Sequence, residues 1–563
     1  MNLEKISEIE YNLSNLIFQE KTHMQTSKPL RGSTPQPDHI MISIFDDAKT
    51  SMAVTWRTST DVTNGYVEYR EDGSNEILRT EAQSDVFKSD IDISNIYWAH
   101  LEGLKPGTKY YYTCGDETHR SGEYFFTTQP EGLTRFKFLC VSDQQKGDPF
   151  DAPDYSYFNQ LIKRYLKEHP DTAFILTAGD NTDCGQHEQQ WNGAFLGWEG
   201  IAEYVPVMFT EGNHDTRGFA DYRNGVGRYY SEPAEFFCTQ LKGSYPYNGP
   251  EGWKTENYAF DYGNVHFTVL GVNGPEDVNA WLKADLEKCD ADWKIGTYHF
   301  PVCYTGSDCQ NYDCYPVMTE SMEMLDLLFS GHEHSFGRSF PRKNEELFEQ
   351  PSKGMINYVL GNSNQNPPGT RSLSKVWHSA FYTMEDRTSM VAVAEVDGKK
   401  LTITASLEDG RIADRCTIDK ENDVIEPRAL APYFNRTRMM YKGADLGLCQ
   451  YQTTCENVDD VWYGCLSVLF TYFGGRVEKT ENQVYLEGYG HWARFTQDSK
   501  VVETDRGTVE LENAVFRNAE RKNQLYIPLD AVKLFDMRWA YAKRNNFILI
   551  EHESEDKPIT EQP

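Results

Sequence analysis

Short runs that alternate apolar and polar residues fill the chain between residues 38 and 129. They include HIMISIF, SMAVTWRT, GYVEYR and TKYYYTCG, and turns rich in Gly, Asp, Asn and Pro separate them. Alternation with a period of two buries one side of an extended segment and leaves the other side in solvent. The pattern therefore predicts a small antiparallel β-sandwich over residues 38–129.

The pattern changes at about residue 134, where apolar runs begin to alternate with helix-like stretches such as YSYFNQLIKRYLKEH and VNAWLKADLEKC. This alternation is typical of βαβ units that cover a central sheet. Two ordinary strands, in SMVAVAEVDG and KLTITASLEDG, end the region. We predict a central α/β domain over residues 134–421.

The remaining segments predict linkers and one further folded unit. Residues 1–37 begin with a helix-like stretch and continue into the Pro-containing linker SKPLRGSTPQPDH, and residues 422–447 are irregular. Residues 448–553 contain two similar stretches, each a helix, a turn and a hairpin strand, which predicts a small α+β module. The last residues, 554–563, have the composition of a disordered tail.

Composition and charge exclude some classes of partner. Hydrophobic residues make up 39% of the 563 residues, as in globular proteins. The net charge of −31 repels polyanions, so we expect neither duplex nucleic acid nor an anionic membrane surface as a partner. No run approaches the roughly 18 apolar residues of a transmembrane helix.

The first residues, MNLEKISEIEYNLSNLIFQE, lack a basic region followed by an apolar core. We therefore expect a cytoplasmic protein, with an extracellular or cell-envelope location as the alternative. The 12 cysteines form no CxxC pair, and we expect reduced, buried thiols. In an exported protein, disulfides could form within two cysteine groups: Cys303, Cys309 and Cys314, and Cys449, Cys455 and Cys465.

Five apolar runs of the central domain each end in a cluster of polar residues. In chain order the clusters hold Asp143 and Gln145, Asp180 and Asp183, Asn213 with His214 and Asp215, His299, and His332 with His334. If each run is a strand, all clusters emerge at carboxyl ends of strands, along one edge of the sheet. Singly, such residues are most often helix caps, turn formers or satisfied polar groups, whereas five clusters together favour one shared site.

The residue types in these clusters are suited to binding metal ions. Carboxylate, imidazole and carboxamide groups bind Mn, Fe or Zn, and the lack of thiolates argues against a structural zinc site. Two cations about 3.5 to 4 Å apart need a bridging ligand. Asp180 is our candidate, because a carboxylate has two oxygens. A water shared by two such ions loses its proton near neutral pH and becomes a nucleophile.

The ordered motifs resemble those of a known superfamily. Asp143, GDNTD at 179–183, GNHD at 212–215, His299 and GHEH at 331–334 together resemble the calcineurin-like metallophosphoesterases. GHEHSFGRSFP, the closing strands and the preceding sandwich with VTWRT and LEGLKPGTKYYY further resemble purple acid phosphatases, over about residues 38–421. The resemblance implies a fibronectin type III-like sandwich followed by a catalytic β-sandwich flanked by helices.

The resemblance also implies a role for each matching residue. The first metal ion would be held by Asp143, Asp180 and His334, and the second by Asp180, Asn213, His299 and His332. His214 and Asp215 would be the catalytic residues, with His214 contacting the phosphate and helping the leaving oxygen depart. The ions would be two divalent or trivalent cations, Fe, Mn or Zn, of open identity.

Two positions depart from the family pattern. Asp183 stands where purple enzymes have the tyrosine that gives their colour, so we predict a colourless enzyme. Asp183 either binds metal or orients a ligand, and we favour the second role. Gln145 stands where many members have a histidine ligand, so the first site is either one ligand short or uses the amide oxygen. The loop after His299 lacks the paired histidines of plant members, which leaves the substrate open.

The C-terminal unit resembles the copper amine oxidase N-terminal-like module, a domain often appended to cell-envelope proteins. His491 and His552 form no ligand pattern, so we assign the unit no metal. We expect a binding or spacing role for it, with the cell envelope as a candidate partner.

The predicted function is metal-dependent hydrolysis of a phosphate monoester on a small phosphorylated substrate, as in an acid phosphatase. A phosphodiesterase or nucleotidase is the first alternative, because the same metal centre performs both reactions. The second alternative is a non-catalytic cell-envelope binding protein in which the phosphatase-like domain is a relic. The nearly complete ligand set argues against the relic.

Overall fold

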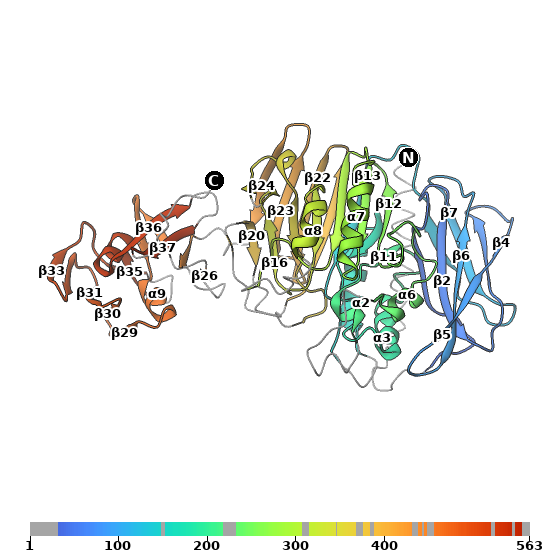
Figure 1. Cartoon of the computed structure of the whole chain (residues 1–563), viewed down its shortest axis with the longest axis horizontal. Helices are drawn as coiled ribbons and strands as arrows, with labels where there is room; N and C mark the ends of the chain where they lie inside the picture. Colours follow the sequence, from blue (N-terminus) through green and yellow to red (C-terminus); the bar gives the residue numbers. More distant parts are fainter. Residues whose placement is uncertain are drawn as a thin grey trace.

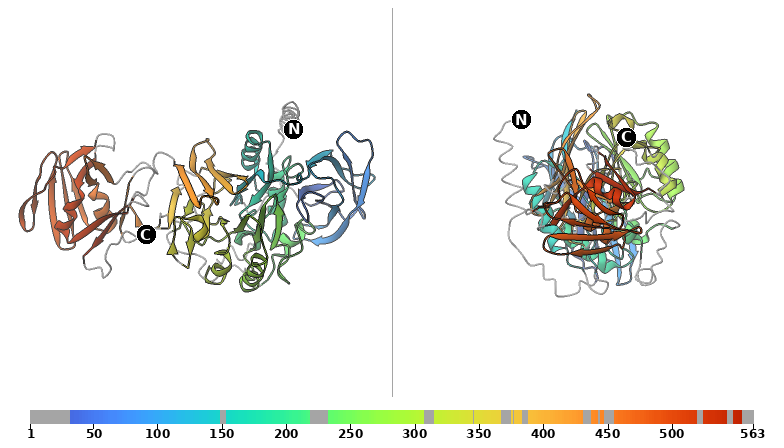
Figure 2. Two further views of the ribbon diagram at one scale, coloured as in Figure 1. Left: turned by 90° about the horizontal axis from the view of Figure 1, so that it is seen from above. Right: turned by 90° about the vertical axis from the view of Figure 1, so that its left-hand side faces the viewer.

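The computed structural model arranges three folded units in a row, with the largest unit in the middle (Figures 1 and 2). The structure describes residues 32–147, 153–217, 232–306, 315–344, 346–366, 375, 377–382, 388–430, 437–441, 444–446, 455–518, 524–542 and 547–553. The predicted helix near the start of the chain and the predicted tail at 554–563 lie outside these residues. No helix in the described ranges is long and apolar enough to cross a membrane.

The first unit is a sandwich of two four-stranded sheets, with strand orders β1-β2-β6-β5 and β4-β3-β7-β8. Its strands are β1 (Asp38–Ser43), β2 (Met52–Ser59), β3 (Tyr66–Glu71), β4 (Leu78–Glu81), β5 (Gln83–Lys88), β6 (Ile93–Leu101), β7 (Lys109–Gly115) and β8 (Tyr124–Thr127). Trp56, Tyr97 and Tyr112 are buried in its core, where large aromatic rings fill the space between the sheets. The prediction of a β-rich N-terminal domain is confirmed.

The central unit contains two seven-stranded sheets that pack face to face. Their orders are β11-β10-β9-β21-β22-β23-β24 and β12-β13-β14-β15-β19-β16-β20. Phe138 and Phe174 of the first sheet contact Phe267 of the second edge to face, at ring-centroid distances of 5.3 and 5.2 Å. The single central sheet predicted from the alternating runs is therefore wrong, and the flanked β-sandwich implied by the resemblance is the observed form.

The elements of the central unit follow the predicted runs closely. The first sheet consists of β9 (Arg135–Val141), β10 (Thr172–Thr177), β11 (Val207–Met208), β21 (Met390–Asp397), β22 (Lys400–Leu407), β23 (Ile412–Asp419) and β24 (Val424–Leu430). The second consists of β12 (Tyr258–Tyr262), β13 (Val265–Leu270), β14 (Trp293–Tyr298), β15 (Leu327–Ser330), β16 (Phe336–Ser339), β19 (Ile356–Val359) and β20 (His378–Tyr382). Minor elements are β17 (Arg342–Lys343), β18 (Glu346–Leu347) and the 3-10 helix η1 (Pro351–Lys353).

Helices cover the two outer faces of this sandwich (Figure 2). The helices are α2 (Ser156–Glu168), α3 (Glu188–Trp198), α4 (Asn213–Thr216), α6 (Glu235–Gln240), α7 (Pro275–Leu286) and α8 (Tyr315–Met322). Helix α2 buries Phe158 and Ile162 in the core that contains the first sheet. Helix α7 buries Val278 and Leu282 in a separate cluster with the second sheet's outer face. Both helices cover a sheet with an apolar stripe, as amphipathic helices do.

Parallel pairing gathers the strand ends that matter for the site. Strands β9, β10 and β11 are parallel neighbours, as are β13, β14 and β15. The carboxyl ends of each group therefore lie together at one edge of their sheet. The predicted clusters follow strands of both sheets, so the site lies across two sheet edges rather than along one.

The C-terminal unit is rich in strands. It contains β25 (Arg438–Tyr441), β26 (Ala444–Asp445), β27 (Cys455–Val458), β28 (Val461–Gly464), α9 (Leu466–Tyr472), β29 (Arg476–Lys479), β30 (Gln483–Gly488), β31 (His491–Thr496), β32 (Val501–Thr504), β33 (Gly507–Glu510), β34 (Phe516–Asn518), β35 (Gln524–Pro528), the 3-10 helix η3 (Leu529–Phe535), β36 (Met537–Ala542) and β37 (Phe547–His552). Helix α9 with β29–β30 and η3 with β36–β37 form two helix–turn–hairpin halves. The second helix is only a 3-10 stretch, so the unit contains less helix than predicted.

Part of the segment predicted to be an irregular linker is ordered strand. Val424 pairs with Asp419 in the central unit, because β24 extends the first sheet. Further on, β25 pairs with β37 of the C-terminal unit. Among the predicted disulfide groups, Cys303 and Cys465 are free thiols. Cys309, Cys314 and Cys449 lie outside the described residues.

Candidate metal centre

Four predicted ligands lie in turns that directly follow buried strands. Asp143 follows β9, Asp180 follows β10, and His332 and His334 follow β15. Their backbone φ angles are 51°, 57°, 76° and 51°, in the left-handed region. Few residues other than glycine adopt this conformation, which occurs preferentially at functional sites. The sharp turns direct the side chains across the ends of the strands.

One group of acceptor atoms converges on Asn213. Nε2 of His299 lies 3.1 Å from Oδ1 of Asn213 and 3.1 Å from Oδ2 of Asp180, and Nδ1 of His332 lies 2.9 Å from the same Asn213 oxygen. Nδ1 of His299 lies 2.8 Å from the carbonyl of Ala178, which fixes the ring proton on Nδ1 and leaves Nε2 with a lone pair. A cation between these atoms would satisfy all of them.

A second group of acceptor atoms converges on Asp143. Oδ1 of Asp143 lies 3.3 Å from Nε2 of His334, and the side-chain amide of Gln145 lies 3.2 Å from the same nitrogen. The hydroxyl of Ser142 donates to Oδ2 of Asp143 at 2.6 Å, and the backbone N–H of His332 donates to Oδ1 at 2.9 Å. These hydrogen bonds hold the Asp143 carboxylate in one orientation toward the group.

Asp180 lies between the two groups and belongs to both. Its Oδ2 is 3.1 Å from Nε2 of His299 and 3.3 Å from the amide of Gln145. Its Oδ1 accepts a hydrogen bond from the backbone N–H of His214 at 2.9 Å. A single oxygen, rather than the two that we predicted, therefore faces both groups. Burial raises the pKa of Asp180, but His214 and His299 lower it more, and the net pKa lies well below its ordinary value.

His214 lies at the edge of this centre and is held by Asp183. Nδ1 of His214 is 2.8 Å from Oδ1 of Asp183, and its Nε2 is 3.7 Å from Oδ2 of Asp180. Arg217 donates to the same Asp183 oxygen at 3.2 Å. Burial raises the pKa of Asp183, but the hydrogen bond from His214 and the charges of His214 and Arg217 together outweigh burial, and the pKa is lowered. The ionised Asp183 thus orients His214, and it contacts neither group of acceptors.

The structure assigns Asp215 a different position from the predicted catalytic one. Its fully buried carboxylate accepts hydrogen bonds from the backbone N–H groups of Asn181, Thr182 and Gly212 at 3.0, 2.9 and 2.9 Å. Burial and the charge of Asp180 raise the pKa of Asp215 to about 6. Asp215 therefore ties the loop after β10 to the loop after β11, and its oxygens are occupied by protein donors.

Two residues near the centre were not predicted. Arg217 lies only two positions after Asp215, but the sequence alone does not distinguish an arginine of the site from an ordinary surface arginine. Asn366 lies far along the chain, and its side-chain NH₂ donates to the carbonyls of Asp143 and Gln145, both at 2.8 Å. No local pattern in GNSNQN connects Asn366 to a loop more than 200 residues earlier.

Known families match the chain across both of the first two units. The purple acid phosphatase N-terminal domain matches residues 37–128, and the calcineurin-like phosphoesterase family matches residues 136–336. The chain therefore contains a purple acid phosphatase N-terminal domain followed by a calcineurin-like phosphoesterase domain. The calcineurin-like phosphoesterase domain implies a binuclear metal centre, and the two groups of acceptor atoms are a fitting site for one.

The curated relatives of the chain include plant phosphatases. Purple acid phosphatase 15 of Arabidopsis thaliana is 28% identical over 293 residues, covering 45% of this chain and 51% of that protein. Purple acid phosphatase 23 of the same species is 26% identical over 364 residues, covering 54% of this chain and 75% of that protein. The chain thus spans about half the length of the first relative.

A solved purple acid phosphatase from yellow lupin seeds has the same fold. Its TM-score is 0.54 at 18% identity, covering 71% of this chain and 78% of the lupin chain. The predicted resemblance to calcineurin-like and purple acid phosphatases is confirmed by the family matches and this shared fold.

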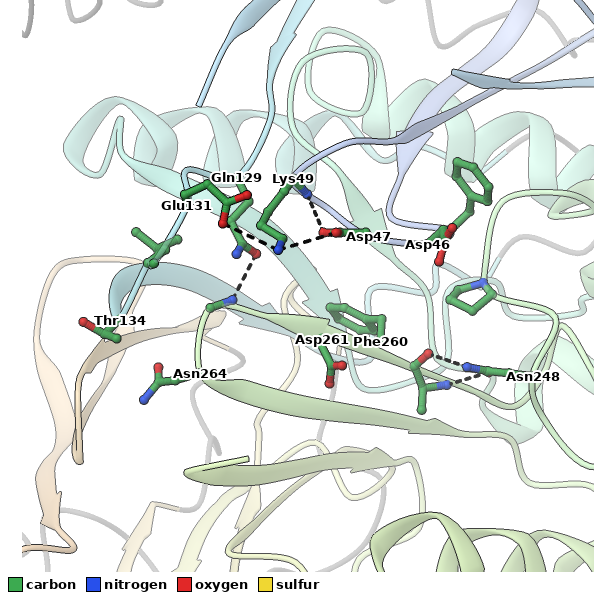
Figure 3. A pocket seen from close by; sticks show the side chains of 16 residues that line it. Asp46, Asp47, Lys49, Gln129, Glu131, Thr134, Asn248, Phe260, Asp261 and Asn264 are labelled. Carbon is green, nitrogen blue, oxygen red and sulfur yellow. Dashed lines mark hydrogen bonds and ion pairs between the residues drawn. The ribbon is translucent and has the colours of Figure 1, made fainter. Parts of the chain in front are cut away.

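A separate cavity of about 660 Å³ lies where the first unit meets the central unit (Figure 3). Lys49 lies in it between two carboxylates, with Nζ 3.6 Å from Asp47 and 3.6 Å from Glu131. Thr134 lines the cavity just before β9 begins, whereas Asp143 follows the end of β9. The cavity and the metal centre are therefore at opposite ends of this strand.

Proposed function

We propose that the protein is a metal-dependent phosphomonoesterase that hydrolyses small phosphorylated substrates. The observation that carries the proposal is the convergence of two groups of acceptor atoms on one oxygen, Oδ2 of Asp180. One ion would be held by Asp143, Asp180 and His334, and the other by Asp180, Asn213, His299 and His332. When bound, two such ions lower the pKa of a shared water and offset the charge of the phosphoryl group.

The side chains around the centre supply positioning and proton transfer. Asp183 accepts a hydrogen bond from Nδ1–H of His214, and Nε2 of His214 points toward Asp180 and the centre, where it can donate to a phosphoryl or leaving oxygen. Protonating the leaving oxygen lowers the cost of expelling an alkoxide. Arg217 places a further positive charge beside this pair. Asp143, held by Ser142 and His332, is fixed before substrate arrives, and such preorganisation favours catalysis.

We further propose ions of Fe, Mn or Zn without a bond between iron and a tyrosinate. Asp183 stands at the position of the colouring tyrosine, and it is engaged by His214 and Arg217. An iron-loaded preparation should therefore be colourless in the region of a tyrosinate–iron band. Mass spectrometry of protein purified without chelator identifies the metals, and a visible charge-transfer band would contradict the proposal.

Activity assays separate the main proposal from its two rivals. The metal-loaded protein should hydrolyse 4-nitrophenyl phosphate faster than bis(4-nitrophenyl) phosphate, and the reverse order would favour a phosphodiesterase or nucleotidase. Asp180→Asn weakens the charge shared by both ion positions and should lower kcat by about 100-fold or more. A metal-replete protein that cleaves neither ester would support the non-catalytic relic.

We also propose identities for the first and last units and a cellular location. The first unit is proposed to be fibronectin type III-like, and the last to be a helix-containing module similar to the copper amine oxidase N-terminal-like domain. For the last unit we propose a binding or spacing role, with cell-envelope contact as its candidate partner. The proposed location is the cytoplasm, and the cell envelope or exterior is the alternative. Fractionation of the native host, with the full chain detected by antibody, separates the two.

A further inference from the structure

Gln145 has two contrasting surroundings at its side-chain amide. The side chain is 3% exposed, so its polar atoms depend on protein or ligand partners. On one side of the amide lie the backbone carbonyls of Asp143 and Asp180, at 3.0 and 3.2 Å. On the other side lie Nε2 of His334 at 3.2 Å and Oδ2 of Asp180 at 3.3 Å.

The two carbonyls determine how this amide is oriented. A carbonyl oxygen only accepts hydrogen bonds, and the NH₂ group of glutamine is the donor half of the amide. With the NH₂ toward the carbonyls of Asp143 and Asp180, both buried oxygens gain a donor. The opposite orientation would set Oε1 of Gln145 against two carbonyl oxygens, which repel it, and would gain for that oxygen only a contact of 3.5 Å with the NH₂ of Asn366. The amide oxygen therefore faces His334 and Asp180.

In this orientation the oxygen joins the group of acceptors around the first ion position. The oxygen lies 3.2 Å from Nε2 of His334 and 3.3 Å from Oδ2 of Asp180. Nε2 of His334 in turn lies 3.3 Å from Oδ1 of Asp143. Adjacent ligands around one cation are about 3 Å apart when each metal–ligand bond is about 2.1 Å and adjacent bonds are at right angles. The measured spacings match this arrangement.

The backbone of Gln145 is also fixed in place. Its N–H donates to the carbonyl of Asp180 at 3.0 Å, and its carbonyl accepts from the side chain of Asn366 at 2.8 Å. A ligand held by such contacts loses little further freedom when a metal binds.

We infer that the amide oxygen of Gln145 is a fourth protein ligand of the ion held by Asp143, Asp180 and His334. This inference rests on the proposed function only in requiring that ions bind at the centre. It resolves the alternative left open by the sequence, in which the first site was either one ligand short or used the amide. The side-chain NH₂, meanwhile, ties the loop after β9 to the loop after β10.

Two substitutions distinguish metal binding by the amide oxygen of Gln145 from the contact that its NH₂ group makes between the two loops. Gln145→Glu keeps an oxygen at the ion position and loses the NH₂ donor, whereas Gln145→Met is of similar length and removes both. Chelator-stripped proteins are titrated with Zn²⁺, and bound metal is measured by mass spectrometry. Gln145→Met should lower the affinity for the more weakly bound equivalent of Zn²⁺ by about 10- to 100-fold or more. Gln145→Glu should bind both equivalents at least as tightly as the unmodified protein.

A spectroscopic readout tests coordination without any assay of activity. Loaded with Co²⁺, the Gln145→Met protein should show changed visible bands, because losing a ligand changes the coordination of one ion. The control is Gln365→Met, on an exposed side chain of a neighbouring loop, which should leave metal content and spectrum unchanged. Gln145→Met that binds two equivalents with unchanged affinity and spectrum would overturn the inference. Equal losses of metal affinity in Gln145→Glu and Gln145→Met would also overturn the inference, since loss of the NH₂ contact between the loops would then explain both.

Failure of the proposed function gives a different result. If the unmodified protein binds two equivalents, cleaves no phosphate ester, and responds to the two substitutions as expected, Gln145 is a ligand and the phosphatase proposal fails. If it cleaves esters with two ions bound and Gln145→Met changes neither affinity nor spectrum, the phosphatase proposal stands and the ligand inference fails. If it binds no metal, both fail.

Discussion

The backbone conformations of individual residues show most clearly how this centre is built. Four of its acidic and histidine residues hold left-handed backbone conformations, which for residues with a side chain cost on the order of 1 to 3 kcal/mol each. Hydrogen bonds from the surrounding loops offset this cost. The N–H of His332 donates to Asp143, and the N–H of His214 donates to Asp180. Contacts between loops, together with the hydrogen bond from Ser142 within its own loop, thereby hold the candidate ligands in place.

We expect the carboxylate of Asp183 to support catalysis through His214. Asp183→Asn keeps the size of the side chain and removes the charged acceptor that orients His214, so kcat should fall by about 10- to 100-fold. Metal content should stay at the level of the unmodified protein, because Asp183 touches neither group of acceptors. Steady-state kinetics and metal analysis provide both readouts.

A double substitution checks that Asp183 acts through His214. In a His214→Ala background, Asp183→Asn should cause little further loss of kcat, because the residue it orients is gone. Additive losses would show that Asp183 acts separately. A lost equivalent of metal in Asp183→Asn alone would instead make it a ligand.

We expect the buried carboxyl of Glu203 to make the free energy of unfolding depend on pH. Burial raises the pKa of this carboxyl from 4.5 to about 7, against hydrogen bonds from backbone N–H groups. Between these values the folded protein keeps a proton that the unfolded chain releases, so stability is lost as pH rises from 4.5 through 7. Glu203→Gln stays neutral and should raise the free energy of unfolding at pH 8 by up to about 3 kcal/mol.

Urea denaturation of both proteins at pH 5 and pH 8 measures this effect of Glu203. At pH 5 the difference between Glu203→Gln and the unmodified protein should be small, because the native carboxyl is already protonated there. A difference of equal size at both pH values would mean that Glu203 does not carry the pH dependence.

The candidate ligands could be predicted because short motifs contain the residue types that bind metal ions. GDNTD, GNHD and GHEH each place a candidate ligand directly after an apolar run, and the structure brings these residues together. The role of Asp215 was not predictable in the same way. Its hydrogen-bond donors come from residues some 30 positions earlier, Asn181 and Thr182, and only the fold brings them to it.

At the scale of elements, small residues allow the site loops to touch. Gly212 precedes Asn213, and a Cβ at Gly212 would lie 2.2 Å from the backbone nitrogen of Asp180. Gly331 precedes His332, and a Cβ there would lie 2.0 Å from Oγ of Ser142. The glycines of the motifs are therefore required for the close approach of neighbouring loops, independently of the ligands they precede.

Gly212→Ala tests this packing of loop against loop. The added methyl must displace the backbone of Asp180, and a displacement of about 1 Å lowers activity on the order of 100-fold. We expect that loss together with weaker binding of both ions, since Asp180 faces both. The control is Gly122→Ala in the first unit, where the nearest atom to the new Cβ is 3.7 Å away. Full activity in Gly212→Ala would show that the two loops separate without harm.

The sequence predicted the strands better than their partners. The runs ending at Val141 and Ser330 are strands as expected, because buried apolar segments carry that pattern themselves. Their assignment to two sheets depends on pairings over long distances, such as Cys140 of β9 with Ala392 of β21. Periodicity within a run contains no information about such a partner, so the runs alone indicated one sheet where there are two.

In the molecule as a whole, one hydrophobic core crosses the boundary between the first two units, and a second, separate core lies in the C-terminal unit. The first core contains Met41 and Phe87 of the first unit together with Phe138 of the central unit. Arg57 of β2 also forms a buried salt bridge with Glu188 of α3, across the same boundary. The second core, which contains Leu469 and Phe535, is formed by residues of the C-terminal unit. We therefore expect the first two units to unfold together.

The C-terminal unit should unfold in a separate thermal transition, which scanning calorimetry resolves. Ions that bind only the native central unit stabilise it by mass action, so chelation should lower the Tm of the first transition and leave the second unchanged. Phe470→Ala removes a fully buried ring from the second core and should lower that unit's free energy of unfolding by roughly 3 to 5 kcal/mol. If chelation and Phe470→Ala each shifted one common transition, all three units would have to unfold as a single cooperative body.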